Sequence, residues 1–414
     1  MTKTPRRIAF DILKAVESEG AYSNILLNRR LQQSPDSDPA FVRRLVHEVL
    51  KNQTLLDVQI DRYLRKGNVK LPARILLRMG FCQLALCDDI PDHAAVSETV
   101  SLAGEVMRGN EGFINAVLRS FLRDGKRIVL PDCDPQDPAS LVRYLSVKYS
   151  CREWIVKRWI DSYGRERAEW QLRESLEPAP LVLRGNRLKV GNAYEFDTSG
   201  GIQASQDYRE GRFSVQDASA IEAINALHPK KGERVLDMCA APGGKTCAMA
   251  EYMENEGEIL ACDIHEGKLA LVEKEAQRLG ISIIRTCPRD ARTAPPAEEA
   301  ASYDAVLCDV PCSGLGVLRR KPEIKLRLKE EDVKALPSIQ AKILANAAAF
   351  VKPGGRLMYC TCTVDPAENE RVTGEFLQEG TFEKIRERQI FIGEILEGTK
   401  GDGFYYCLMR KKNL

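Results

Sequence analysis

The chain has 414 residues, of which 44% are hydrophobic and 29% are charged, and its formal net charge is +2. This length allows two or three domains with substantial cores, and the composition is that of an ordinary soluble protein. No apolar run is long enough to span a membrane. The nearly neutral total charge neither requires nor excludes nucleic acid as a partner.

Thirteen cysteines are spread over the chain. Its first residues lead into an amphipathic pattern rather than a secretory signal. We therefore expect a cytoplasmic protein in which most thiols are small buried hydrophobes. We expect no metal site, because there is no C-x-x-C pair and the four histidines lack ligand spacing.

Residues 1–127 are predicted to be entirely helical. Apolar residues recur at helical spacing, as in Ile8, Ile12 and Val16, and there is little β-type alternation. Arginine and lysine residues on the outer faces could bind RNA phosphates or could be ordinary solvated charge. The pattern by itself leaves both interpretations open.

Residues 128–180 are predicted to form a linker followed by helices. The segment 129–138 is rich in proline and aspartate, and helical periodicity resumes from about Ser140 to Glu177. All three tryptophans lie in these helices, interleaved with basic residues. This mixture suits RNA, which is bound by stacking and phosphate contacts, but it equally suits a helix with a tryptophan-filled core face.

Residues 181–414 are predicted to form an α/β domain. Strand-like runs at 234–238, 258–262, 281–286, 305–307 and 356–360 are separated by helical stretches at 246–253, 268–279 and 333–351. Such alternation indicates a mostly parallel sheet.

A loop of small residues, Cys239-Ala240-Ala241-Pro242-Gly243-Gly244-Lys245, joins the first of these strands to a helix. Small residues let a ligand approach the backbone, and N–H groups at the helix start face it. A P-loop would need glycine at position 239, and the dinucleotide fingerprint G-x-G-x-x-G is absent. The remaining candidate is S-adenosylmethionine, whose methyltransferases use a short glycine-containing turn after the first strand.

Acidic residues follow the neighbouring strands. Asp263 lies about twenty residues beyond the glycines, where a carboxylate suits a ribose diol, and Asp290 could accept from an adenine amino group. Each acid alone could be a helix cap. Acids at successive strand ends favour the cofactor interpretation, for which the predicted set is Cys239, Ala240, Ala241, Pro242, Gly243, Gly244, Lys245, Asp263, Asp290 and Asp309.

Two further strands are each followed by a cysteine: Cys312, in Asp309-Val310-Pro311-Cys312-Ser313-Gly314, and Cys362, in Thr361-Cys362-Thr363. A doubly wound sheet delivers such positions to its ligand crevice. One reactive thiol suggests covalent catalysis, and two suggest that one attacks while the other assists release. Spacing alone leaves the order of the two undecided.

These motifs, with Arg319-Arg320-Lys321-Pro322-Glu323 and Pro366-Ala367-Glu368-Asn369-Glu370, resemble the RNA cytosine-5 methyltransferases of the nucleolar-protein and ribosomal-RNA type. The N-terminal region is similar to the NusB-like RNA-binding domain, a combination found in bacterial 16S ribosomal RNA methyltransferases. The resemblance covers nearly the whole chain. It implies a Rossmann-like class I methyltransferase with a mostly parallel seven-stranded sheet, preceded by an all-α NusB-like domain. It also implies S-adenosylmethionine as cofactor and 16S ribosomal RNA as partner.

By this resemblance Cys362 is the nucleophile, Cys312 assists release, and Asp309 binds the pyrimidine edge, with Lys245 contacting the substrate or Asp309. Adding a thiolate to C6 of cytosine makes C5 enamine-like and able to accept a methyl group. We expect Cys360 to point away from Cys362 and to serve only packing.

RNA contacts are expected from Arg184, Arg319, Arg320 and Lys325, although basic runs are most often plain surface. Alternatives are the same chemistry on transfer RNA or another RNA, and a non-catalytic RNA-binding or ribosome assembly factor. A P-loop ATPase is disfavoured by Cys239. DNA cytosine-5 methylation would use Cys312 for attack and leave the Thr-Cys-Thr element without a purpose. Nothing requires an oligomer, so a monomer is expected.

Overall fold

The computed structural model describes residues 4–34, 37–64, 69–134, 136–190, 201–202 and 205–413. The chain forms two compact units. The first comprises Met1–Pro178 and Leu318–Arg327, and the second comprises Ala179–Val317 and Leu328–Leu414. Among the described residues, no helix combines the length and the apolar character needed to cross a membrane.

The first unit is helical in its described residues, as predicted for positions 1–127. Its helices are α1 (Pro5–Glu19), α2 (Ser23–Gln32), α3 (Pro39–Lys51), α4 (Gln53–Asp61), α5 (Leu71–Leu86), α6 (Asp92–Val106), α7 (Glu111–Arg123), α8 (Pro138–Lys148), α9 (Glu153–Glu174) and α14 (Ile324–Arg327). The helix starts follow ordinary capping rules: Asp38 accepts hydrogen bonds from the first N–H groups of α3, and Pro39 takes its first position. The apolar faces share one core, in which the rings of Phe81 and Phe121 stack at 4.2 Å.

The first unit extends further than the sequence suggested. The helices α8 and α9, predicted as a connector, belong to it. It also takes up Leu318–Arg327, which carries the whole basic motif Arg319–Glu323. Glu323 accepts hydrogen bonds of 2.9 Å from both the backbone N–H and the hydroxyl of Ser23. These partners lie 300 residues apart, so no local pattern could have indicated the contact.

The second unit contains a seven-stranded sheet in the order β5-β4-β3-β6-β7-β11-β8. The strands are β3 (Arg234–Asp237), β4 (Glu258–Asp263), β5 (Ile284–Pro288), β6 (Tyr303–Asp309), β7 (Val351–Thr361), β8 (Phe382–Ile390) and β11 (Phe404–Lys411). In this sheet β11 alone runs in the opposite direction to the other six strands. The predicted mostly parallel sheet is therefore confirmed. Two small antiparallel sheets of two strands each lie outside it among the described residues, β1 (Leu183–Gly185) with β2 (Phe213–Val215), and β9 (Ile395–Leu396) with β10 (Thr399–Lys400).

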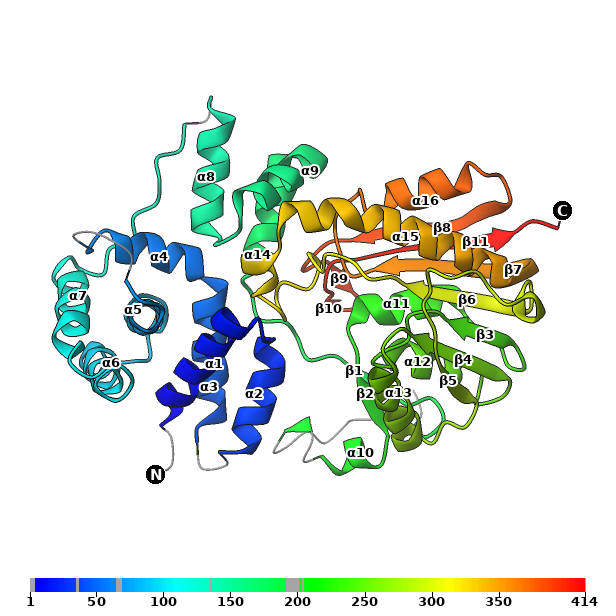
Figure 1. Ribbon diagram of the computed structural model, residues 1–414, viewed down its shortest axis with the longest axis horizontal. Helices are drawn as coiled ribbons and strands as arrows, with labels where there is room; N and C mark the ends of the chain where they lie inside the picture. Colours follow the sequence, from blue (N-terminus) through cyan, green and yellow to red (C-terminus); the bar gives the residue numbers. More distant parts are fainter. Residues whose placement is uncertain are drawn as a thin grey trace. The chain divides into compact units, whose positions relative to one another are not determined.

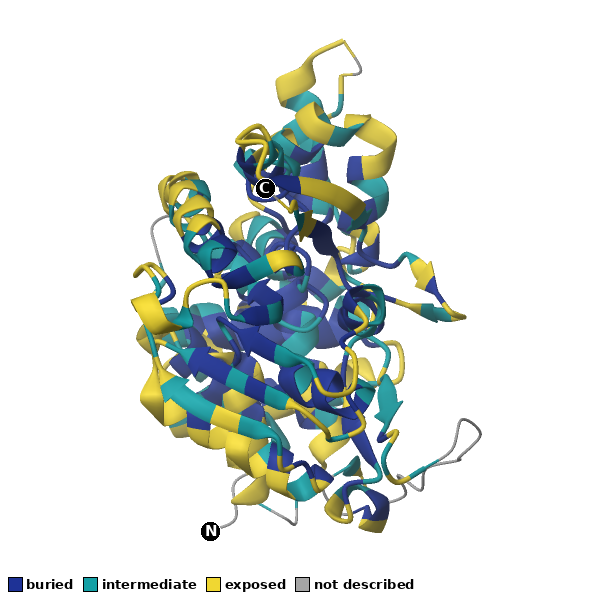
Figure 2. Cartoon of the chain, turned by 90° about the vertical axis from the view of Figure 1, so that its right-hand side faces the viewer, coloured by how far each residue is buried: buried dark blue, intermediate teal, exposed yellow. Residues whose placement is uncertain are grey.

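Helices cover both faces of the sheet. In Figure 1, α11 (Ala218–Leu227), α12 (Gly244–Tyr252) and α13 (Glu266–Leu279) lie on one face, and α15 (Glu330–Phe350) and α16 (Glu370–Leu377) cover the other. A short helix, α10 (Gln206–Arg209), precedes β2. Successive strand residues alternate between the two cores, so Val235 packs with α11–α13 and Leu236 with α15–α16. Figure 2 shows the resulting buried strands in dark blue.

The strand order reverses between β3 and β6. From β3 the chain proceeds outward through β4 and β5, then returns to the other side of β3 for β6 and β7. Ligands of open α/β sheets bind beyond the carboxyl ends of the strands at such a switch point. The segments that follow Asp237 and Asp309 begin there.

Candidate active site

The loop after β3 is held in a tight turn. The N–H of Ala240 donates to the carbonyl of Cys262 at 2.8 Å, and the N–H of Gly243 donates to the carbonyl of Ala240 at 2.8 Å. Gly243 has a φ of 107° and would place a Cβ only 2.9 Å from the Cα of Val272, so glycine is needed for both reasons. The turn brings the first residues of α12 to the switch point, where their N–H groups suit a negatively charged group of a ligand, such as a carboxylate.

A buried carboxyl group at the end of β3 stabilises this turn. Asp237, at the end of β3, accepts a hydrogen bond of 2.7 Å from the hydroxyl of Thr246 in α12. Complete burial raises the pKa of Asp237 to about 7. Its hydrogen bond with Thr246 therefore joins α12 to the end of β3.

The predicted cofactor residues suit S-adenosylmethionine. Asp263 ends β4, beside the loop, and one of its oxygens accepts from the N–H of His265 at 2.9 Å. Its carboxylate would hold the ribose hydroxyls. Asp290 already accepts four hydrogen bonds from Arg292, two at each carboxylate oxygen, so an adenine amino group would have to displace one of them. The bound cofactor would supply an electrophilic methyl group.

Lys245 and Asp309 form the charged pair of the site. The ammonium of Lys245 donates to Oδ2 of Asp309 at 2.6 Å and lies 5.2 Å from the ring centroid of Phe404. Burial alone would lower the pKa of Lys245, but the charge of Asp309 outweighs it and raises that pKa above its ordinary value. Lys245 therefore remains charged. Oδ1 of Asp309 accepts no hydrogen bond from the residues that the structure describes, which leaves it for a substrate.

The two cysteines meet at the same edge of the sheet. Cys312 follows β6 and Cys362 follows β7, and their sulfur atoms lie 3.3 Å apart. Both residues are partly buried. The hydrogen bond with Cys362, together with burial, raises the pKa of Cys312 well above its ordinary value, so Cys312 retains its proton at neutral pH.

The expectation that Cys360 points away from Cys362 is wrong. Residues two apart in a strand lie on the same face, and both cysteines pack with the core on the α11–α13 side. Cys360 is nevertheless fully buried, so the packing role assigned to it agrees with its position.

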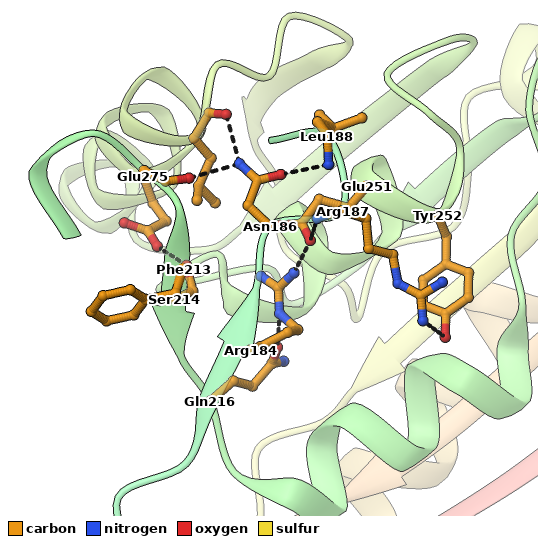
Figure 3. A network of polar contacts seen from close by, with 12 residues as sticks. Arg184, Asn186, Arg187, Leu188, Phe213, Ser214, Gln216, Glu251, Tyr252 and Glu275 are labelled. Atoms are coloured by element: carbon orange, nitrogen blue, oxygen red, sulfur yellow. Dashed lines mark hydrogen bonds and ion pairs between the residues drawn. The ribbon is translucent and has the colours of Figure 1, made fainter. Parts of the chain in front are cut away.

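Three of the four residues predicted to contact RNA are held inside the protein. Figure 3 shows Arg184 of β1 between Gln216, which accepts from its Nε at 2.6 Å, and the buried Glu251, with which it forms an ion pair. Lys325 is 1% exposed and donates to the carbonyls of Lys51 and Tyr149 at 2.8 and 2.9 Å. These side chains stabilise the fold in this structure instead of facing RNA.

The other two residues of the predicted RNA set differ from each other. Arg319 is only 2% exposed, so it too is withdrawn from solvent, whereas Arg320 is partly exposed and stays a prediction. The run of positive charge suggested a surface, but the segment Leu318–Arg327 is folded into the helical unit.

The segment after Cys362 contributes residues to which no role was assigned from sequence. Glu368 accepts from the N–H of Ser313 at 2.9 Å, and Asn369 donates to the carbonyl of Thr363 at 3.1 Å and accepts from the hydroxyl of Thr361 at 2.6 Å. Both side chains are fully buried. The signal was present, because the segment matched a motif of the resembled family, but its partners could not be identified without the fold.

Comparisons with known proteins agree with the geometry of this site. A family model described as 16S rRNA methyltransferase RsmB/F matches residues 224–409, and a NusB family model matches residues 3–123. A protein of Bacillus subtilis (strain 168), named probable ribosomal RNA small subunit methyltransferase B, is 37% identical over 457 residues and covers 100% of both chains. The chain belongs to the ribosomal RNA small subunit methyltransferase B family. A member from Salmonella arizonae is 30% identical, with 98% of each chain covered.

Solved structures support the same fold. The crystal structure of PH0851 superposes with a TM-score of 0.77 at 24% identity, covering 99% of this chain and 100% of that one. A methyltransferase homolog protein from Pyrococcus horikoshii gives a TM-score of 0.54 at 24% identity, covering 66% and 99%. Family membership confirms the resemblance inferred from the motifs, with S-adenosylmethionine as the cofactor and RNA cytosine-5 methylation as the family's chemistry.

Proposed function

We propose that this protein transfers a methyl group from S-adenosylmethionine to C5 of a cytosine in 16S ribosomal RNA, with Cys362 as nucleophile and Cys312 assisting release. The main support for this proposal is that four side chains meet at one switch point of the sheet. The sulfur atoms of the two cysteines are 3.3 Å apart, and Nζ of Lys245 lies 2.6 Å from Oδ2 of Asp309. The family's other members support 16S ribosomal RNA as the substrate.

In the first step, the thiolate of Cys362 bonds to C6 of the cytosine, and the electrons of the C5–C6 double bond become available at C5. C5 then bonds to the methyl carbon, whose bond to the sulfonium breaks. Asp309 would hold the base by accepting from its exocyclic amino group through Oδ1, while Lys245 keeps that carboxylate ionised and oriented.

In the second step, the proton on C5 is lost to a base, the C5–C6 double bond re-forms, and the bond between C6 and Cys362 breaks. The sulfur of Cys362 leaves as a thiolate. Because Cys312 is held as a thiol 3.3 Å away, it can donate its proton to that thiolate and favour its departure.

A pair of variants tests this division of labour. Cys362→Ala is expected to abolish methylation and any covalent RNA adduct, whereas Cys312→Ala is expected to accumulate an adduct that survives denaturing gels. Cys360→Ala, which alters a buried thiol on the same face, is the matched control and should keep turnover. An adduct formed by Cys362→Ala would overturn the assignment.

We further propose that the enzyme works as a monomer in the cytoplasm, where ribosomal RNA is made. Size-exclusion chromatography with light scattering tests the oligomeric state. Mapping 5-methylcytosine in total RNA from a deletion strain tests the substrate, because loss from transfer RNA instead of 16S ribosomal RNA would favour the same chemistry on a different RNA.

A further inference from the structure

Glu368 is a buried acid that touches both cysteine loops. It is fully buried, and its Oε2 accepts two hydrogen bonds of 2.9 Å, from the N–H of Ser313 and from Nε2 of Gln340. Gln340, in α15, also donates to the carbonyl of Pro311 at 3.0 Å. Through these contacts the residues on both sides of Cys312 are tied to one carboxyl group.

The same carboxyl faces the loop of the other cysteine. The hydroxyl of Thr363, directly after Cys362, lies 3.5 Å from Oε1 of Glu368 and 2.8 Å from the hydroxyl of Ser313. The 3.5 Å contact is at the limit of a hydrogen bond, and the 2.8 Å contact is a strong one. The residues following the two cysteines are therefore bonded to each other next to Glu368.

Packing alone does not explain an acid at this position. Burial raises the pKa of Glu368, and no lysine or arginine forms an ion pair with it within the part of the chain that the structure describes. A glutamine would accept the same hydrogen bond from Ser313 without the cost of a buried charge. A costly acid beside reactive groups indicates a function.

We propose that Glu368 is a positioning residue that fixes the approach of the two catalytic thiols and keeps their roles unequal, an inference that rests on the proposed functions of Cys362 and Cys312. The carboxylate is one of the groups that disfavour the thiolate form of Cys312. It thereby helps Cys312 to retain the proton that the release step uses, while the loop bonds hold that thiol against Cys362.

The test compares Glu368→Gln with Glu375→Gln, which changes an exposed glutamate in α16. Glu368→Gln removes the charge but nearly preserves the shape. We expect kcat to fall about 10- to 100-fold, because the hydrogen bonds accepted at this position are no longer strengthened by a negative charge, with the KM for S-adenosylmethionine unchanged. Glu375→Gln should behave as wild type.

The discriminating measurement is the pH dependence of alkylation of Cys312 by iodoacetamide, followed by peptide mass spectrometry. In Glu368→Gln the profile is expected to move to lower pH, because a negative charge near the thiol is gone. Wild-type kcat, or a reduced kcat with an unmoved profile, would overturn the proposal.

Two further results keep the test decisive. If Glu368→Gln fails to bind S-adenosylhomocysteine in calorimetry and is therefore misfolded, Glu368→Asp takes its place. The shorter acid keeps the charge, so the pH dependence of Cys312 alkylation should stay as in the wild type while kcat falls. A wild-type kcat in Glu368→Asp would refute the positioning role. Adduct formation by Cys362→Ala, in contrast, would refute the proposed function itself.

Discussion

Gly316 lies where the chain after Cys312 passes the backbone of two other segments. Its N–H donates to the carbonyl of Cys362 at 3.0 Å, and its own carbonyl accepts from the N–H of Gly403 at 2.9 Å. A Cβ at this position would lie 1.9 Å from the carbonyl oxygen of Gly403 and 2.8 Å from that of Cys362. Both are backbone atoms, so no side-chain rotation can relieve the contact.

Gly316→Ala is therefore expected to displace the catalytic loops. Cβ atoms in real structures essentially never approach another atom within 3.0 Å, so the 1.9 Å contact must open by about 1 Å. Overpacking of this kind costs about 1–3 kcal/mol, which lowers the melting temperature of a domain of about 150–250 residues by about 2–12 °C. A displacement of about 1 Å at reacting groups can slow turnover about 100-fold.

The assays are thermal unfolding and transfer of labelled methyl groups to RNA under saturating S-adenosylmethionine. Gly374→Ala is the matched control, because Gly374 lies inside α16 and an added Cβ would meet no atom within 4 Å. That substitution should leave turnover unchanged and stabilise the protein by about 0.4–1 kcal/mol. If Gly316→Ala has the melting temperature and the methyl-transfer rate of the wild type, the close backbone contacts of Gly316 do not constrain the site.

Two further predictions concern stability. The pKa of Asp237 is about 7 in the fold and near 3.8 in the unfolded chain, so the folded state binds the extra proton and its stability falls as pH rises from about 4 to about 7, by at most about 4 kcal/mol. Asp237→Asn should flatten this dependence in urea titrations while keeping the bond from Thr246, and an unchanged pH dependence would contradict the assignment. Asn186, buried beside Arg184 in Figure 3, donates to the carbonyls of Gly211 and Leu279 at 2.8 and 2.9 Å. Asn186→Ala should lower the free energy of unfolding by about 1–3 kcal/mol in thermal unfolding experiments. An unaltered melting temperature would show that these carbonyls find other donors.

Local sequence was sufficient for much of the methyltransferase unit. The central strands were predicted because short apolar runs end in small-residue turns or acids, and both features act within a few residues. The outer strands β8 and β11 were missed. β8 is largely charged and only its ends, Phe382 and Ile390, are buried, so it lacks the apolar run that marks a central strand.

Basic residues show the opposite failure. Lys325 and Arg319 resemble an exposed RNA-binding run, yet both are buried. Burial lowers the pKa of Lys325 to about 8, and its ammonium is satisfied by two backbone carbonyls from distant segments. A one-dimensional pattern reports charge but not the carbonyl groups that can accept from it, so exposure could not be predicted there.

The sequence by itself determined the chemistry of the site: two thiols, a lysine, an acid and a glycine-containing turn, all at the end of a strand or in the segment that follows it. Only the tertiary structure decided which of them meet. Cys312 and Cys362 are 50 residues apart and become neighbours because β6 and β7 are adjacent and parallel. Glu368 acquires its partners for the same reason, since it reaches Ser313 across that pair of strands. A local motif shows which residue types follow a strand. Distances of about 3 Å between side chains that are remote in sequence depend instead on strand order and register.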